Sequence, residues 1–218
     1  MQVICPILRG RDIKRYGYEF ADLWIIATFP SLHYDIDVYP AVKQHLLSFG
    51  YDRLKQTGDV GARKKTNNEW FETQDSISYW DDFFKPKIIF QEIVQEPSFM
   101  MDFDEHFFCL DTGRIITGKN LEFLLSIFNS NIFFFAIKHF YGGGGLGATG
   151  VRMKHTFFEH FPCINTQNLI ETLSEKTNQI IQNKAIGINT HTLEEEAETL
   201  INNAYGLTQE EIQFIENQ

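Results

Sequence analysis

Basic side chains occur in four clusters along the chain, each beside aromatic or amide residues. The clusters comprise Arg9, Arg11, Lys14 and Arg15; Arg63, Lys64, Lys65, Asn67 and Asn68; Lys85 and Lys87; and Arg152 and Lys154. Guanidinium and ammonium groups bind phosphates, arginine can pair with the edge of guanine, and asparagine can pair with adenine. Residues of these types are therefore suited to contacts with the backbone and the bases of DNA.

Such clusters also occur as ordinary solvated faces, so composition alone leaves DNA binding undecided. The formal net charge of -10 argues against a nucleic-acid partner, because phosphate contacts need cations. The charge is unevenly distributed, however. Residues 1–155 contain 17 Lys and Arg against 19 Asp and Glu, whereas residues 156–218 contain 2 against 10. Most of the acidity therefore lies in the C-terminal tail.

Other site chemistries find weak support in the sequence. Gly145-x-Gly147-x-x-Gly150 matches the dinucleotide fingerprint, but the preceding segment is rich in Phe and no strand–helix–strand unit surrounds the glycines. The glycine run is therefore interpreted as a flexible connection. No nucleophile motif or phosphate loop is present, so we expect no catalytic residue and no cofactor in this chain.

Metal binding is also disfavoured by the spacing of the ligand-type residues. Asp102, Asp104 and Glu105 could hold a divalent ion, but their strand–turn–strand context favours hairpin residues that bond their own backbone. His155 and His160 are five residues apart, which places them on different faces of a helix. We therefore predict no metal site.

The three cysteines, at positions 5, 109 and 163, are widely spaced and include no Cys-x-x-Cys pair, as expected for reduced thiols. The N-terminus has no secretory signal pattern. The longest apolar stretch, around residues 132–137, is far shorter than the ~20 residues that span a bilayer. We expect a cytoplasmic protein with no membrane partner.

The first half of the chain predicts few regular elements. Residues 4–18 are basic and contain two glycines, which indicates a loop or short helix leading into a strand over residues 23–29. Pro40 begins a predicted amphipathic helix over residues 39–49. Residues 55–68 lack apolar periodicity, so we expect a mobile loop that becomes ordered on a DNA duplex.

A meander of short antiparallel strands is predicted next, at residues 87–93, 98–101, 106–110 and 115–117. Asn120 is expected to cap a helix over residues 121–128, and Asn129-Ser130-Asn131 should end it before a second apolar run.

The tail predicts two amphipathic helices. Their apolar faces contain Ile170, Leu173, Thr177, Ile180 and Ile181, and Leu193, Ala197, Leu200, Ile201 and Ala204. Thr192-x-x-Glu195 and Thr208-x-x-Glu211 match the capping box. The sequence thus predicts an α+β fold, with an antiparallel-sheet domain at residues 1–165 and a helical appendage at residues 166–218. We expect the first domain to stay folded without the appendage.

Several segments resemble, in order, those of one family. They are PILRGRDIKRY (6–16), YPAVKQHLLSF (39–49), WFET (70–73), KPKIIFQEI (85–93), DTGRIITGKNLEFLLSIFNSN (111–131), RMKHTFFEHFPC (152–163) and the ending EEEAETLINNAYGLTQEEIQFIE (194–216). The family is the TaqI-like C-terminal specificity domain of type IIG restriction-modification enzymes and related adenine-specific DNA methyltransferases. Phe90 stands where the family has Trp, and Cys163 where Ile follows the proline.

The resemblance implies a target recognition domain that reads double-stranded DNA and positions a methyltransferase, and in some enzymes an endonuclease. Neither the Asn-Pro-Pro-Tyr motif nor the S-adenosylmethionine loop of the methyltransferase occurs here. Because the chain begins almost inside the first matching segment, we expect it to be part of a longer polypeptide. S-adenosylmethionine and, in enzymes that also cleave DNA, Mg²⁺ would then bind the other domains.

The sequence leaves three other functions open. One is a separate specificity subunit, as in type I systems. Another is a protein-interaction module that docks its acidic helical tail on a methyltransferase. The third is a nuclease that uses Asp82, Glu92 or residues 102–105, but the required proline–aspartate and Glu-x-Lys arrangement is absent.

Overall fold

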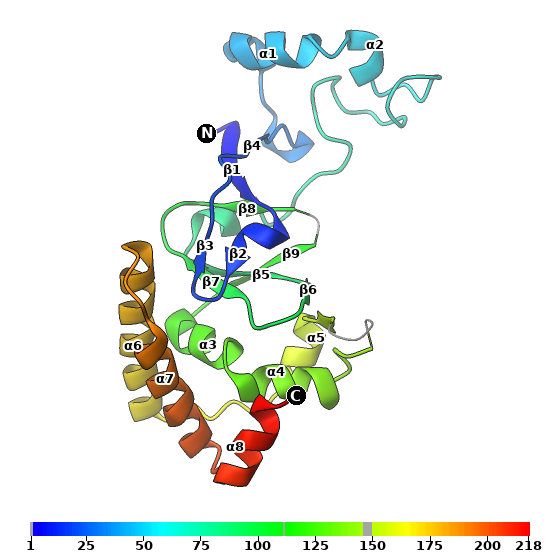
Figure 1. The fold of residues 1–218 in the computed structure, drawn as a ribbon. Helices are drawn as coiled ribbons and strands as arrows, with labels where there is room; N and C mark the ends of the chain where they lie inside the picture. Colours follow the sequence, from blue (N-terminus) through cyan, green and yellow to red (C-terminus); the bar gives the residue numbers. More distant parts are fainter. Residues whose placement is uncertain (1, 111, 146–149) are drawn as a thin grey trace.

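The computed structural model describes residues 2–110, 112–145 and 150–218. It has the α+β fold that the sequence predicts, with small sheets in the middle of the molecule. An arm of two helices lies at one end, and the C-terminal helices lie at the other (Figure 1). The strands are β1 (Ile4–Leu8), β2 (Ile13–Lys14), β3 (Gly17–Tyr18), β4 (Trp24–Ile26), β5 (Lys87–Gln91), β6 (Ile93–Val94), β7 (Phe99–Asp102), β8 (Phe108–Cys109), β9 (Gly113–Thr117) and β10 (Val151–Arg152).

The central sheet has the strand order β7-β5-β9 and is antiparallel throughout. Side chains alternate along β5, so that Ile88 and Phe90 point to the helices while Ile89 packs against Leu8 and Met100 on the other face. Since both faces are covered, β5 is a continuous apolar run rather than an alternating one.

The second sheet corrects two expectations. Residues Ile4–Leu8, predicted to be a loop or short helix, form β1. Strand β1 pairs antiparallel with β4 and parallel with β8, so β8 does not belong to an antiparallel meander. A strand as short as β8 contains no local signal for its partner, which lies about a hundred residues earlier in the chain. The remaining pairs are β2 with β3 and β6 with β10, both antiparallel.

The helices are α1 (Pro40–Leu47), α2 (Tyr51–Leu54), α3 (Leu121–Phe128), α4 (Asn131–His139), α5 (His155–Phe158), α6 (Gln167–Ala185), α7 (His191–Ala204) and α8 (Gln209–Glu216). Pro40 occupies the first turn of α1, as predicted. The break between α3 and α4 is also confirmed, and the hydroxyl of Ser130 caps α4 by accepting from the N–H of Phe133. Asn120 has a left-handed backbone and makes no side-chain cap, so that predicted cap is wrong.

The helical tail shares its core with the sheet. Leu173 and Ile180 of α6, and Ala197 and Ile201 of α7, are buried in the same apolar cluster as Phe99 of β7. Removal of the tail would uncover the face of the sheet and of α3, so this shared core argues against a separable appendage. The division at residue 165 stays a prediction. Amphipathic periodicity predicts a buried face but does not identify what covers it.

Only one of the two predicted capping boxes is present. Thr208 and Glu211 exchange the expected hydrogen bonds at the start of α8. Helix α7 begins at His191, one residue before Thr192, so Thr192 lies inside the helix and cannot cap it.

The arm is built around its own small core, in which Val3, Ile36, Val42 and Phe71 are buried together. Helices α1 and α2 lie at the outer end of this arm (Figure 1). The chain between α2 and Phe71 therefore folds as one unit with the arm.

Among the described residues, no single helix is long and apolar enough to cross a membrane. The pair α3 and α4 passes that test only when combined, and it is bent by 64°. Gly147 of the glycine pattern lies outside the described residues.

Candidate nucleic-acid interface

The loop between α2 and Phe71 is pinned by polar side chains rather than by apolar packing. The guanidinium of Arg63 donates from Nε to the carbonyl of Leu54 at 2.7 Å and from its terminal nitrogen to the carbonyl of Trp70. Gln56 is buried and donates to two further carbonyls across the loop. The side-chain amide of Asn68 donates to the carbonyls of Thr73 and Gln74.

These bonds divide the second basic cluster into two classes. Lys64, Lys65 and Asn67 are exposed, whereas Arg63 and Asn68 are partly buried and already engaged. Burial lowers the pKa of Arg63 from its ordinary value. The sequence predicted a mobile loop in which all five residues contact DNA. The structure instead shows two of them as anchors that hold the other three in place.

The backbone supports the same arrangement. The N–H of Arg63 donates to the carbonyl of Lys55, the N–H of Gly58 donates to that of Arg63, and the N–H of Thr66 donates to that of Gln56. Residues 55–58 and 63–66 therefore lie side by side across the loop. Lys64 and Lys65 follow directly on the anchored Arg63, so both lysines extend from a fixed backbone.

The first basic cluster is also divided. Arg9 and Asp12 form an ion pair at 2.7 Å, and the carboxylate of Asp12 also accepts from the N–H of Arg9, which closes the turn Gly10–Asp12. Arg11 and Lys14 are exposed, although Lys14 lies 3.6 Å from Glu19. Within this cluster, Arg11 and Lys14 remain accessible to a ligand.

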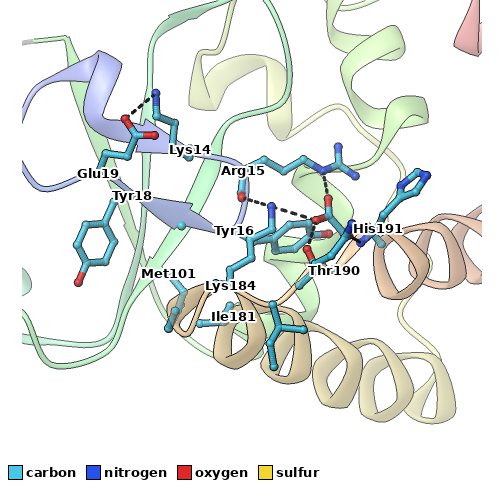
Figure 2. A pocket seen from close by; sticks show the side chains of 16 residues that line it. Lys14, Arg15, Tyr16, Tyr18, Glu19, Met101, Ile181, Lys184, Thr190 and His191 are labelled. Atoms are coloured by element: carbon cyan, nitrogen blue, oxygen red, sulfur yellow. Dashed lines mark hydrogen bonds and ion pairs between the residues drawn. The ribbon is translucent and has the colours of Figure 1, made fainter.

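Arg15 anchors the β2–β3 hairpin to the tail. Its Nε lies 2.8 Å from Oε2 of Glu194 in α7, and its terminal nitrogen donates to the carbonyl of Asn129. Lys184 of α6 donates to the carbonyl of Arg15 at 3.0 Å and also pairs with Glu194 (Figure 2). The prediction that Arg15 contacts DNA is therefore corrected, because its guanidinium is bound within the protein.

Tyr16 completes the anchor. It is buried in the main core with a left-handed backbone (φ 58°), and its N–H donates to the carbonyl of Phe99. Burial raises the pKa of its hydroxyl to about 12. These residues line a groove of about 810 Å³ between the hairpin and helices α6 and α7 (Figure 2). Arg15 and Lys184 both pair with the single carboxylate of Glu194, so each of these two cations in the groove already has a protein partner.

Lys85 and Lys87 differ completely in environment. Lys85 is exposed and pairs with Asp82 at 2.6 Å. Lys87 has no exposed surface, and its ammonium lies between Oδ2 of Asp102 at 2.6 Å and the carbonyl of Phe83 at 2.7 Å. Lys87 was predicted to contact DNA, and that prediction is wrong because its side chain is enclosed in the core.

The fourth cluster, Arg152 and Lys154, lies beside a further arginine that is distant in the sequence. Arg152 lies on β10 and Arg114 on β9, and both contact the carboxylate of Glu92. Lys154 is partly exposed two residues after Arg152. No other Lys or Arg lies within four residues of Arg114 in the sequence, so no local cluster marked it. The signal that could have identified Arg114 is its position on a predicted edge strand, where a charged side chain can reach the surface.

The carboxylates considered for metal binding or nuclease chemistry form separate structural contacts. Asp102 accepts from the N–H of Glu105 and the N–H of Phe107, so it bonds the backbone of its own turn as predicted. The turn is not a hairpin, however, because β7 pairs with β5 and β8 pairs with β1. Asp82 and Glu92 pair with Lys85 and with the two arginines, respectively. Within residues 2–110, 112–145 and 150–218, no group of three or more His, Cys, Asp or Glu is placed to hold a metal ion.

Comparison with known proteins gives one family. The model of the TaqI-like C-terminal specificity domain matches residues 5–162, which include the arm, the central sheet and all four basic clusters. No curated protein matches the chain.

Proposed function

This chain belongs to the TaqI-like C-terminal specificity domain family, the DNA specificity modules of restriction-modification enzymes, and we propose that it reads duplex DNA through its arm. Lys64 and Lys65 would contact phosphates, and Asn67 would contact a base edge. The exposed Arg11 and Lys14 would add a second contact from the first basic segment.

The observation that carries this proposal is the anchored loop. Arg63, Gln56 and Asn68 fix the backbone on both sides of three exposed polar residues. Binding to DNA costs entropy because it orders both the loop backbone and its side chains. A backbone that is already fixed removes the backbone part of this cost. A rigid loop also limits which base edges Asn67 can reach, as sequence discrimination requires.

The charge distribution fits the same orientation. The acidic tail helices lie at the end of the molecule opposite the arm (Figure 1). A duplex on the arm would therefore avoid the strongest repulsion, while the tail would disfavour binding at the other end.

We propose further that a methyltransferase domain of the same polypeptide performs the chemistry and binds S-adenosylmethionine. On this division of labour, the present chain contributes binding energy and discrimination and catalyses no reaction. No methyl transfer is then expected from the chain by itself.

Salt-dependent binding to duplex DNA tests the proposed function. The chain should bind a duplex weakly, and the logarithm of its affinity should fall linearly with the logarithm of salt concentration. Lys64→Ala or Lys65→Ala should each lower that slope by about one unit. Lys138→Ala is the matched control, because this lysine lies on α4 away from the arm and donates to the carbonyl of Gln218. An equal effect of all three substitutions would reject the arm as the interface.

A protein-interaction module is the second candidate, and one observation favours it. Phe140 and Phe214 are 70% and 57% exposed beside a groove of about 650 Å³ between α4 and α8. Exposed aromatic side chains at a groove are typical of protein interfaces. Tight binding to a methyltransferase core without salt-sensitive binding to DNA would favour this candidate over DNA recognition.

A further inference from the structure

Glu92 lies at the junction between two ladders of strands. It follows β5, which pairs with β9, and precedes β6, which pairs with β10. Its N–H donates to the carbonyl of Thr112 at 3.0 Å, and its carbonyl accepts from the N–H of Met153 at 2.6 Å. The backbone of Glu92 is therefore fixed from both sides by the segments that carry Arg114 and Arg152.

Two guanidinium groups share the carboxylate of Glu92. Arg114 donates to Oε2 from a terminal nitrogen, and Nε of Arg152 lies 3.7 Å from Oε1. The side chain of Glu92 is 16% exposed, whereas those of Arg114 and Arg152 are 44% and 38% exposed. The anion is thus covered, while both cations reach the surface.

The orientation of Arg152 leaves its terminal nitrogens available. Its Nε is buried on the side of Glu92 and has no hydrogen-bond partner among the described residues. Within the same described part of the chain, no hydrogen bond holds the two terminal nitrogens. The edge formed by the two terminal nitrogens is therefore without a hydrogen bond in the described part of the chain. Two parallel donors of this kind match O6 and N7 of guanine.

The first basic segment lies next to this site. A Cβ at Gly10 would come 2.3 Å from Oε1 of Gln91, so the backbone of the turn at Gly10–Asp12 passes directly over the residue before Glu92. The exposed Arg11 belongs to that turn. The turn that contains Arg11 therefore lies next to Gln91, the residue before Glu92.

We propose that Arg152 reads a guanine edge in the DNA duplex, with Glu92 as the positioning residue that fixes its guanidinium. This inference rests on the proposed function and adds a base type and a reading residue to it. Arg114 shares the carboxylate, so Glu92 does not pair with Arg152 alone. Fixing a guanidinium before binding lowers the entropic cost of a two-bond contact, which favours a base edge over a phosphate.

Substitution by lysine separates base reading from phosphate binding. Arg152→Lys keeps the charge but removes the planar pair of donors, so a phosphate contact would survive and a guanine contact would not. The experiment first selects preferred duplexes from a random library with the wild-type chain at low salt. Each guanine of the selected duplex is then replaced in turn by 7-deazaguanine, which lacks the N7 acceptor.

Replacement of one particular guanine should weaken DNA binding by the wild-type chain but not by Arg152→Lys. This replacement should weaken wild-type binding by about fivefold or more, since a bidentate Arg–guanine pair gives roughly 1–3 kcal/mol of discrimination. The same replacement should weaken binding by Arg152→Lys less than about twofold. This variant should bind random duplex as tightly as the wild type does. Lys154→Ala, which removes a neighbouring cation, should retain the response. Thermal unfolding by circular dichroism verifies that each variant is folded.

Glu92→Gln tests the positioning role. Loss of an anion should leave binding to random duplex equal or tighter, but the response at the same guanine should fall severalfold. Retention of the full response in Arg152→Lys would overturn the assignment of Arg152, and retention in Glu92→Gln would overturn that of Glu92. A wild-type chain that selects no sequence would instead reject DNA recognition, and the present inference with it.

Discussion

Nζ of Lys87 lies 2.6 Å from Oδ2 of Asp102, and neither side chain has exposed surface. The pair joins β5 to β7 and is fully bonded, because Lys87 also donates to Phe83 and Asp102 also accepts from two backbone N–H groups of the following turn. Burial lowers the pKa of Lys87, and the hydrogen bond and charge of Asp102 only partly offset this effect. An ion pair in this position specifies the register between the two strands.

Breaking this pair should destabilise the protein strongly. Asp102→Asn leaves the ammonium of Lys87 buried without its counter-charge, which costs about 3–5 kcal/mol. Urea unfolding measures the loss. Lys85→Met is the matched control, because Lys85 is exposed and its pair with Asp82 contributes at most about 1 kcal/mol. A loss below about 1 kcal/mol for Asp102→Asn would show that the pair is not held as described.

The two lysines illustrate what a local sequence reveals. Lys85 and Lys87 are two residues apart in KPKIIFQEI, and only the tertiary structure places one in solvent and the other against Asp102. Arg11 and Arg15 present the same problem, since the partner of Arg15 is Glu194, 179 residues later. The basic clusters could be located from the sequence, but the accessible members of each cluster could not.

The fold was predictable to a similar extent. Helical periodicity located α1, α3, α6 and α7 because their apolar faces are long and regular. It could not show that α6 and α7 complete the core of the sheet. The parallel pairing of β1 with β8 was also missed, since strands that short have no distinctive pattern.

Removal of the tail should abolish cooperative unfolding. Leu169, Leu173, Ile180 and Ile201 are buried against the main core, and each large aliphatic side chain contributes about 1.5–3 kcal/mol on burial. Their sum is comparable to the whole net stability of a domain, about 5–15 kcal/mol. A chain ending at residue 165 should therefore show no sharp thermal transition by circular dichroism.

A shorter truncation serves as the control for the tail. Helix α8 has no buried side chain, so a chain ending at residue 206 should retain a cooperative transition. If the chain ending at residue 165 unfolded as cooperatively as this control, the tail would be a separate appendage as its sequence suggested.

Arg63 should act through the order of the loop rather than by contacting DNA. Arg63→Ala removes donors to the carbonyls of Leu54 and Trp70 and leaves them partly buried, which costs about 1–3 kcal/mol. Hydrogen exchange of residues 55–68 should accelerate. Lys64→Ala and Lys65→Ala should leave both the stability and the exchange unchanged. Equal exchange in Arg63→Ala and in the wild type would contradict the anchoring role.

Substitution of Asn67 should affect DNA binding, whereas substitution of Asn68 should affect stability. Asn68→Ala loses two bonds to backbone carbonyls and should lower the free energy of unfolding by about 1 kcal/mol. Asn67→Ala should leave stability intact and cost ~1–3 kcal/mol of binding, mainly on the preferred duplex. Urea unfolding and binding to the selected and random duplexes measure the two effects. If Asn67→Ala lowered the stability and Asn68→Ala weakened binding to the preferred duplex, the two roles would have been assigned the wrong way round.

Protonation of Glu194 at low pH should weaken the attachment of the β2–β3 hairpin to the tail helices. Burial of this carboxyl raises its pKa, but hydrogen bonds from Thr190 and Lys184 and the charges of Arg15 and Lys184 outweigh burial, so the folded pKa lies below the ordinary 4.5. A carboxyl with a depressed folded pKa stabilises the protein above its unfolded pKa, and this contribution is lost as the pH falls through the folded value. The difference in the free energy of unfolding between the wild type and Glu194→Gln should therefore be constant near neutral pH and shrink below about pH 4.5. Glu198, whose pKa burial raises, titrates in both proteins and largely cancels in the difference. A difference that stayed constant through this range, measured by urea unfolding, would show that Glu194 does not hold Arg15 and Lys184 through its charge.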